Sequence, residues 1–368
     1  MAPALALDNE ARGVLPAQCL GELIASGAIR ADVPIGDDQV QPASLDLRLG
    51  ARAHRLPFSF LPGQGATVRE KLDQYSMHSF AIETGAVLEK GCVYLVELEE
   101  SVSLPDRLDG IANPKSSTGR LDVFARVITD GAATFDRVAA GYSGPLYAEI
   151  APRTFSIKVT RGSRLAQLRL RQRNHPLGLG ELKALHAKSP IADSRAPAFS
   201  EHGLPIRLET RPLGADEIIG YRARKHAGLI DIDRVAAYPR EAFWEPVAAR
   251  PGGGLVLDPD DFYILVSKER VAVPPDCAAE MVAYDTLVGE FRVHYAGFFD
   301  PGFGHGHGGT RAVLEVRSHE VPFLVDDGQI VGHLRYDRLT APPDRLYGAK
   351  LGSNYTKQDL NLSKHFLP

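Results

Sequence analysis

Residues 114–120 read Pro-Lys-Ser-Ser-Thr-Gly-Arg and combine the residue types that bind a polyphosphate. The side chains of Lys115 and Arg120 carry positive charge that neutralises phosphate oxygens. The hydroxyls of Ser116 and Ser117 donate hydrogen bonds, and Gly119 lets the backbone approach a ligand closely. The run therefore predicts a phosphate-binding turn between two apolar, strand-like stretches.

Two other interpretations of this run bear on the chemistry. It is not a Walker loop, because the chain has no G-x-x-x-x-G-K-[ST] pattern and no helix is expected after the run. A solvated basic turn has the same composition. The run alone therefore leaves both a phosphate site and a plain turn open, and the flanking sequence favours the phosphate site.

Two further stretches flank the run. Residues 41–50 read Gln-Pro-Ala-Ser-Leu-Asp-Leu-Arg-Leu-Gly, and residues 141–149 read Gly-Tyr-Ser-Gly-Pro-Leu-Tyr-Ala-Glu. Together with the Lys-Ser-Ser run and a short helical pattern at 20–30, they resemble the dCTP deaminase family, relatives of the trimeric dUTPases. The resemblance covers residues 18–172, and a weaker copy covers 255–368.

The resemblance implies hydrolysis of dCTP to dUTP and ammonia, with these nucleotides as small-molecule partners. It implies that Asp136 accepts a hydrogen bond from the sugar 3′-hydroxyl and that Tyr142 excludes a 2′-hydroxyl. Magnesium is expected to bind through the substrate triphosphate, since this ion keeps several waters and needs few protein ligands. No protein metal site is therefore expected, and His305 and His307 are interpreted as part of a mobile turn.

Deamination of cytosine requires water at C4, a proton on the ring nitrogen and a proton on the departing ammonia. One carboxylate can serve all three steps. Glu149 lies in a strand-like stretch where it alternates with Leu146 and Ala148, although a surface glutamate fits this pattern as well. The resemblance assigns Glu149 as the general base. A zinc-dependent route is not expected, because the chain has no C-x-x-C motif.

The elements that must position these residues are predicted to be mostly strands. The chain has 35 glycines and 26 prolines scattered among short β-branched runs. Strands are expected at 93–96, 156–159, 165–170, 262–266 and 312–316, and helices at 17–27, 231–238 and 259–261. The predicted fold is mostly β, with two tandem dUTPase-like, jelly-roll-like β-barrels and few short helices.

The two halves of the chain repeat one pattern, which predicts a duplicated domain. Val87-Leu88, Tyr94, Val102 and Pro105 recur as Val256-Leu257, Tyr263, Val271 and Pro274, at a constant offset of 169 residues. Asp136, Gly144, Glu149 and Gly162 then pair, in the same order, with Asp300, Gly309, Glu315 and Gly328. The expected division has three parts. Residues 1–175 form a deaminase-like domain, residues 176–230 form a linker with the start of the second domain, and residues 231–368 form a diverged domain with a tail.

The second copy lacks the phosphate-binding run. Residues 284–289 read Tyr-Asp-Thr-Leu-Val-Gly, whereas Asp300 and Glu315 are retained as possible second-copy site residues. The family has a C-terminal tail that folds over the nucleotide, and the sequence from Tyr347 resembles it. The sequence leaves open which site the tail closes, and the residues it would contribute are Lys350, Asn354 and Gln358.

Composition limits the other classes of function. A net charge of −4 gives no reason to expect binding to nucleic acid or membranes, and no apolar run reaches membrane-spanning length. The three cysteines lie far apart, so a cytoplasmic protein is expected. The resemblance also implies sites built between subunits around a three-fold axis. Because two copies cannot close such a ring within one chain, a homotrimer is expected.

Two other functions stay open at this point. One is dUTP diphosphatase activity, alone or combined with deamination to give dUMP, in which Asp136 or Asp300 activates water at the α-phosphate. The other is a protein that binds deoxynucleoside triphosphates without turnover. The nucleotide products and the release of ammonia distinguish these functions from dCTP deamination.

Overall fold

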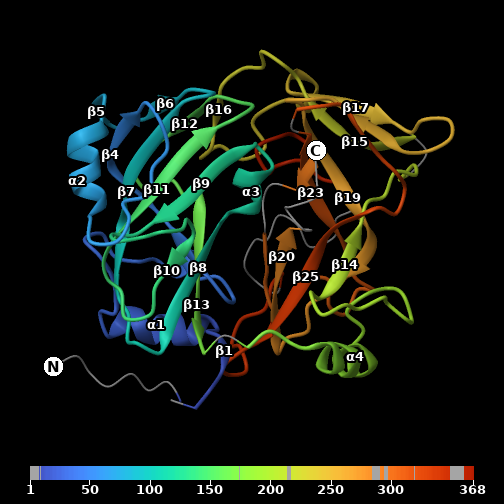
Figure 1. The fold of residues 1–368 in the computed structure, drawn as a ribbon, viewed down its shortest axis with the longest axis horizontal. Helices are drawn as coiled ribbons and strands as arrows, with labels where there is room; N and C mark the ends of the chain where they lie inside the picture. The colour runs from blue at the N-terminus through green and yellow to red at the C-terminus, as the bar shows by residue number, and fades with distance from the viewer. Residues whose placement is uncertain are drawn as a thin grey trace. The chain divides into compact units, whose positions relative to one another are not determined.

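The computed structural model of the chain describes residues 8, 10–173, 175–213, 217–283, 291–293, 297–318, 320–348 and 360–368. Two compact units make up the chain (Figure 1). Unit 1 comprises Met1–His175, Gly228–Val235 and Leu339–Arg345, and unit 2 comprises Pro176–Ala227, Ala236–Arg338 and Leu346–Pro368. Unit 1 therefore includes two short segments from the second half of the sequence.

Strands make up most of unit 1. They are β1 (Gly13–Val14), β2 (Ile29–Ala31), β3 (Leu45–Leu47), β4 (Leu49–Leu56), β5 (His78–Ala81), β6 (Ala86–Leu88), β7 (Val93–Ser103), β8 (Leu108–Pro114), β9 (Val123–Ile128), β10 (Arg137–Val138), β11 (Ser143–Pro152), β12 (Ile157–Val159), β13 (Ala166–Gln172) and β16 (Ile230–Asp231). One sheet has the order β5-β4-β7-β11-β9, with β2 on β7. Another has the order β1-β13-β8-β10, with β3 on β13, and a third the order β16-β12-β6. The described helical segments of this unit are α1 (Ala17–Ala25), η1 (Asp37–Gln39), α2 (Val68–Tyr75) and α3 (Ser116–Gly119).

Strand β11, which lies between β7 and β9, is buried on both faces from Leu146 onward. Because side chains alternate along a strand, Leu146 and Ala148 face one side and Tyr147 and Glu149 face the other, and all four are buried. Tyr147 belongs to an apolar cluster with α2, which contributes Val68 and Leu72. Helix α2 begins with a capping box, in which the Thr67 hydroxyl accepts from the Glu70 N–H and the Glu70 carboxylate accepts from the Thr67 N–H.

Unit 2 is also mostly β. Its strands are β14 (Leu204–Arg207), β15 (Ile218–Ala223), β17 (Trp244–Ala248), β18 (Leu255–Leu257), β19 (Phe262–Val271), β20 (Cys277–Ala283), β21 (Phe291–Val293), β22 (Phe298–Phe299), β23 (Thr310–Ser318), β24 (Phe323–Val325) and β25 (Ile330–Arg338). They form sheets in the orders β17-β15-β19-β23-β21, β14-β25-β20-β22 and β18-β24. The described helical segments are α4 (Leu179–Lys188) and η2 (Arg240–Ala242).

The strand orders of the two units match, which confirms the predicted tandem, mostly β fold. The row β7-β11-β9 corresponds to β19-β23-β21, and β13-β8-β10 corresponds to β25-β20-β22. The hydroxyl of Tyr94 accepts a hydrogen bond from the Glu89 N–H at 3.0 Å. In the second copy the hydroxyl of Tyr263 accepts from the Asp258 N–H at 3.1 Å.

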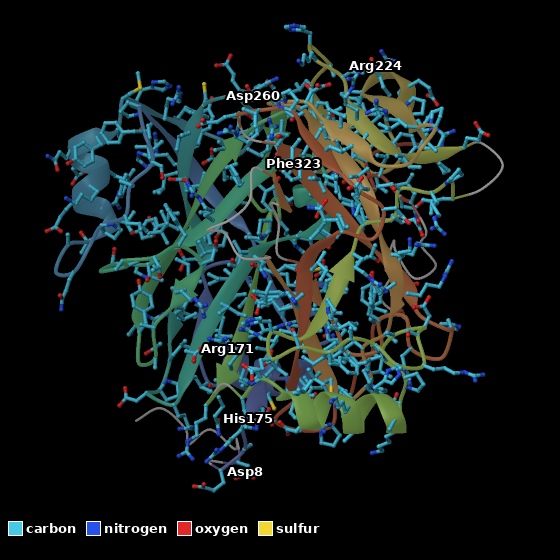
Figure 2. The ribbon with its side chains drawn as sticks, turned by 45° about the vertical axis from the view of Figure 1, so that its right-hand side comes forward. Asp8, Arg171, His175, Arg224, Asp260 and Phe323 are labelled. Atoms are coloured by element: carbon cyan, nitrogen blue, oxygen red, sulfur yellow. The ribbon has the colours of Figure 1, made fainter. Side chains whose placement is uncertain are left out.

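The turn before these two strands also recurs. Gly91 has a φ of 77°, and Asp260, which is labelled in Figure 2, has a φ of 61° at the corresponding position. Aspartate tolerates this left-handed conformation better than most residues with a side chain. The turn geometry has therefore been kept although the residue has changed.

Each predicted strand segment lies within or overlaps a strand, and the helix expected at 17–27 is α1. The helices expected at 231–238 and 259–261 are wrong. Ile230 and Asp231 pair in parallel with β12, Tyr238 forms a bridge with Phe366, and Pro259 forms one with Ser318. These pairings are with residues distant in sequence, and they override the local helical pattern.

The segment 176–230, expected as linker and the start of the second domain, contains α4, β14 and β15. Leu182 and Leu185 of α4 belong to the hydrophobic core of unit 2, together with Ile206 of β14 and Ile219 of β15. Helix α4 was not predicted from the sequence.

The last residues of the chain pack within unit 2. Phe366 is 6% exposed, and its ring centroid lies 5.4 Å from that of Phe243 and 5.9 Å from that of Trp244. The N–H of Leu367 donates to the carbonyl of Tyr238 at 2.8 Å. Residues 360–368 are thus part of the folded unit.

Candidate active site in the first copy

The run 114–120 begins at the last residue of β8 and precedes β9, and its residues Ser116–Gly119 form the single-turn helix α3. Lys115 occupies the N-cap position, and its carbonyl accepts from the N–H groups of Thr118 and Gly119. The side chain of Ser116 is exposed, whereas Ser117 and Arg120 are 7% and 6% exposed. Of the four predicted phosphate ligands, Ser116 is therefore the one most open to a ligand.

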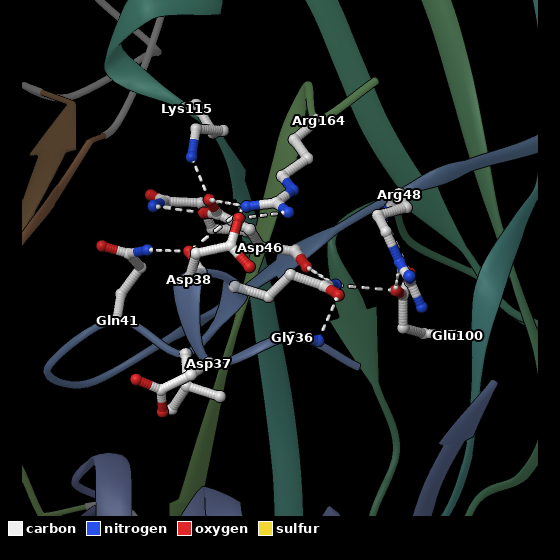
Figure 3. A network of polar contacts seen from close by, with 12 residues as sticks. Gly36, Asp37, Asp38, Gln41, Asp46, Arg48, Glu100, Lys115 and Arg164 are labelled. Carbon is white, nitrogen blue, oxygen red and sulfur yellow. Dashed lines mark hydrogen bonds and ion pairs between the residues drawn. The ribbon is translucent and has the colours of Figure 1, made fainter. Parts of the chain in front are cut away.

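The ammonium group of Lys115 forms an ion pair with the buried carboxylate of Asp46, as Figure 3 shows. Asp46 also accepts a hydrogen bond from Gln167 Nε2 at 3.2 Å. Arg164 lies beside this group, with Nη2 2.7 Å from a carboxylate oxygen of Asp38 and Nη1 4.0 Å from one of Asp46. The motif at residues 41–50 thus contributes the acid that pairs with the lysine of the predicted phosphate-binding run.

A second ion pair joins Arg48 of the same motif to Glu100 of β7. Arg48 and Glu100 are almost fully buried, and Arg48 Nε lies 2.7 Å from Glu100 Oε1 (Figure 3). The remaining guanidinium nitrogens of Arg48 donate to the carbonyls of Val33 and Pro34 at 2.8 and 3.1 Å. Gln39 Nε2 donates to Glu100 at 2.9 Å. This set of contacts joins Arg48, which lies between β3 and β4, to β7, η1 and the segment after β2.

Glu149 is fully buried in the middle of β11, opposite Leu95 of β7 and Arg126 of β9. Nε and Nη2 of Arg126 both donate to Glu149 Oε1, the former at 3.1 Å. Among the described residues, the buried Oε2 has no hydrogen-bond partner. A buried carboxylate oxygen without a partner costs stability, so its position here requires an explanation.

Asp136 lies close to this pair. It has a φ of 60°, and its carboxylate accepts from the N–H of Val127 at 2.8 Å. Burial raises the pKa of Asp136 to about 7, and the negative charge of Glu149 adds to this effect. The Val127 N–H and the positive charge of Arg126 act in the opposite direction. Asp136 thus changes its charge near neutral pH.

Tyr142 is held by two backbone groups. Its hydroxyl donates to the carbonyl of Pro145 at 2.7 Å and accepts from the N–H of Asp130 at 3.2 Å. Burial raises the pKa of Tyr142 to about 12. The ring therefore has a fixed orientation and a neutral hydroxyl, which suits a residue that limits space rather than one that transfers protons.

In the second copy, Asp300 follows β22 and Glu315 lies in β23, and they are 8% and 6% exposed. The diverged run at 284–289 lies outside the described residues. So do the three tail residues predicted to contact the nucleotide, which are Lys350, Asn354 and Gln358.

Two residues of the site were missed or left without a role in the sequence analysis. Asp46 was quoted within a motif, and its position among apolar residues of a strand was the available signal. Arg126 had no such signal, because its contact with Glu149 depends on the register between β9 and β11.

Among the described residues, no group of three or more His, Cys, Asp and Glu side chains is placed to hold a metal ion. None of the helices in that part of the chain is long and apolar enough to cross a membrane.

Family models match almost the whole chain. The model for the N-terminal domain of 2'-deoxycytidine 5'-triphosphate deaminase matches residues 11–174, and that for its C-terminal domain matches residues 179–366. The chain belongs to the dCTP deaminase family. The resemblance drawn from the three sequence motifs is thereby confirmed.

Individual relatives agree with this assignment. The crystal structure of 2'-deoxycytidine 5'-triphosphate deaminase from Agrobacterium tumefaciens is 50% identical, with a TM-score of 0.87, and the match covers 90% of this chain and 100% of that one. A "dCTP deaminase, dUMP-forming" from Halobacterium salinarum is 37% identical over 165 residues, which are 42% of this chain and 79% of the relative. A dCTP deaminase from Haloarcula marismortui is 33% identical over 162 residues, 41% of this chain and 77% of the relative.

Proposed function

We propose that this dCTP deaminase family member hydrolyses dCTP to dUTP and ammonia at the site in its first copy. Relatives named dCTP deaminase support the substrate. The observation that carries the proposal is the carboxylate of Glu149, which is fully buried and held at Oε1 by Arg126. Its Oε2 has no partner among the described residues and is available for proton transfer.

In the proposed mechanism, Glu149 Oε2 accepts a proton from a water molecule as the water oxygen bonds to C4 of cytosine. The carboxyl group passes this proton to N3. It then takes the second proton of the attacking oxygen and gives it to the amino group, so that the C4–N bond breaks and ammonia leaves. A single positioned carboxylate acting in this way contributes a factor of about 10² to 10⁴ in rate.

The phosphate-binding run would hold the triphosphate. Ser116 is exposed and would donate a hydrogen bond to a phosphate oxygen, and Ser117, Lys115 and Arg120 would extend the set. Lys115 is fixed by Asp46 and therefore loses little side-chain entropy when a phosphate arrives. Magnesium would travel with the triphosphate, since it binds phosphate oxygens and water more readily than an all-protein cage.

Asp136 and Tyr142 would contact the deoxyribose, as in the family to which the chain belongs. The rigid ring of Tyr142 supports a role in excluding the 2′-hydroxyl. We place the enzyme in the cytoplasm as a homotrimer, because the family builds its sites around a three-fold axis and a chain with two copies does not complete one.

A second product is the main alternative. The relative from Halobacterium salinarum is named dUMP-forming, and Asp136 has a pKa raised to about 7. A carboxyl group that exchanges its proton near neutral pH can serve as a base for water attack on the α-phosphate. A bifunctional enzyme would then release dUMP and pyrophosphate.

The proposal is tested by incubating the full-length protein with dCTP and Mg²⁺, measuring ammonia and separating the nucleotides by ion exchange. The expected result is one equivalent of ammonia for each dUTP formed. Release of ammonia with formation of dUMP would support the bifunctional alternative. Binding of dCTP without release of ammonia would show that the protein binds the nucleotide without turning it over.

A further inference from the structure

Arg126 contacts the carboxylate of Glu149 from one side only. Arginine–carboxylate pairs are frequently bidentate, with two nitrogens on two oxygens. Here both Nε and Nη2 donate to Oε1, while Oε2 is buried and has no partner among the described residues. The ion pair therefore fixes the carboxylate and leaves one of its oxygens unoccupied.

The guanidinium group is itself held at two other points. Nη2 of Arg126 donates to the hydroxyl of Ser59 at 3.2 Å, and the guanidinium carbon lies 3.8 Å from the ring centroid of Phe135. Ser59 lies between β4 and α2, and Phe135 directly precedes Asp136. Because a planar group stacked on a ring and bonded at one edge has little freedom, it presents a single edge to Glu149.

The position of Arg126 also follows from the sheet. Arg126 is the direct neighbour of Glu149 on the adjacent antiparallel strand, so their side chains leave the sheet on the same face. Its side chain is 31% exposed, whereas that of Glu149 is fully buried. Arg126 thus reaches the buried carboxylate from the solvent side.

We propose that Arg126 is a positioning residue for deamination, which holds Glu149 by Oε1 so that Oε2 faces the attacking water and the pyrimidine ring. This inference rests on the proposed function of Glu149. Arg126 acts through the carboxylate and contacts no substrate atom, so its loss should lower turnover more than nucleotide affinity.

The test compares three variants of the full-length protein in ammonia release and dCTP binding. Arg126→Ala is expected to lower kcat by about 10²-fold, with the dissociation constant of dCTP changed by no more than about threefold. Arg126→Lys should recover part of this loss, and so should millimolar guanidinium ion added to Arg126→Ala. The matched control is Arg153→Ala, because Arg153 lies over the ring of Phe124 at 5.8 Å much as Arg126 does at 5.6 Å.

A wild-type kcat in Arg126→Ala overturns the inference, and so does an equal loss in Arg153→Ala. If Arg126→Ala does not fold by circular dichroism, Arg126→Lys decides: reduced kcat with unchanged dCTP binding supports the inference, and unchanged kcat overturns it. Glu149→Gln in the same assay separates the two proposals. Activity in Glu149→Gln means that the proposed function has failed, whereas an inactive Glu149→Gln beside a fully active Arg126→Ala means that only the inference on Arg126 has failed.

Discussion

The N–H and the side-chain Nε of Arg48 donate to the two carboxylate oxygens of Glu100, at 2.8 and 2.7 Å. Unit 2 contains the same pair with the same atoms, because the N–H and Nε of Arg207 donate to Glu269 at 2.8 and 2.5 Å. Glu100 and Glu269 lie at the offset of 169 residues that relates the two copies. The duplication has therefore kept this polar contact in both units.

The ion pair of Asp46 with Lys115 of the predicted phosphate-binding run has not been kept. Asp46 lies two residues before Arg48, and the residue two before Arg207 is Pro205. Gln167, which donates to Asp46, lies opposite Asn113, and the corresponding strand pair of unit 2 joins His333 to Val282. Asp46 and Asn113 thus have the apolar counterparts Pro205 and Val282, whereas Gln167 corresponds to the polar residue His333.

Glu100→Gln should lower the free energy of unfolding by about 3–5 kcal/mol, because it leaves the buried guanidinium of Arg48 without its counter-charge. Urea unfolding of the full-length protein measures this change. Glu269→Gln is the matched control and should cost less, since the side chain of Arg207 is 48% exposed and that of Arg48 only 9%. Equal losses in the two variants would contradict this account of the pair.

Ser116→Ala should weaken binding of dCTP by about 1.5–3 kcal/mol, the range for a hydrogen bond to a charged group, and leave binding of deoxycytidine unchanged. Isothermal titration with both ligands makes the comparison. Ser143→Ala, another exposed serine of unit 1, is the control. If Ser116→Ala lowers the affinities for nucleoside and triphosphate alike, the run at 114–120 is a structural turn.

The stability of the protein should depend on Asp136 between about pH 4 and pH 7. Burial raises the folded-state pKa of Asp136 from 3.8 to about 7, so the folded protein binds the proton of this carboxyl group more tightly than the unfolded chain does. The stabilisation from this proton is complete below the unfolded-state pKa and is lost as pH rises through the folded-state pKa. Asp136→Asn removes this dependence and retains an oxygen for the Val127 N–H. Relative to wild type, the variant should therefore gain stability as pH rises from 4 to 8, as measured by urea unfolding. A constant difference across this range would show that Asp136 does not titrate there.

Phe366→Ala should destabilise unit 2 by about 3–5 kcal/mol, the cost of removing a buried phenylalanine. Phe366 packs against Phe243 and Trp244 and is 6% exposed, whereas its neighbour Leu367 is 46% exposed and provides the control variant Leu367→Ala. Thermal unfolding is the measurement. Equal midpoints for Phe366→Ala and wild type would contradict the packing of the C-terminal residues.

Local pattern and a few motifs were sufficient to predict much of this molecule. The β-branched runs at 93–96 and 262–266 are strands in the structure. At both places the hydrophobic pattern and the strand propensity of the residues agree with their pairing in the sheets. The helix expected at 231–238 failed because the segment pairs with β12 and with residues near the C-terminus. Sequence alone does not show such partners.

The same distinction applies to the candidate site. Lys115 and Glu149 lie in motifs and could be selected from the sequence. The burial of Glu149 was left open there, and the structure shows that this side chain is fully buried. The ion pair of Lys115 with Asp46 and the contact of Arg126 with Glu149 depend on strand register and on long-range packing. Their roles in catalysis stay predictions.

The central claim is that Glu149, and not its counterpart Glu315, carries the deamination. The direct measurement is the rate of ammonia release from dCTP by Glu149→Gln and Glu315→Gln, with dCTP binding measured on the same samples. We predict that Glu149→Gln binds dCTP and loses a factor of about 10² to 10⁴ in rate, while Glu315→Gln keeps the wild-type rate. An active Glu149→Gln beside an inactive Glu315→Gln would place the chemistry in the second copy and contradict the account.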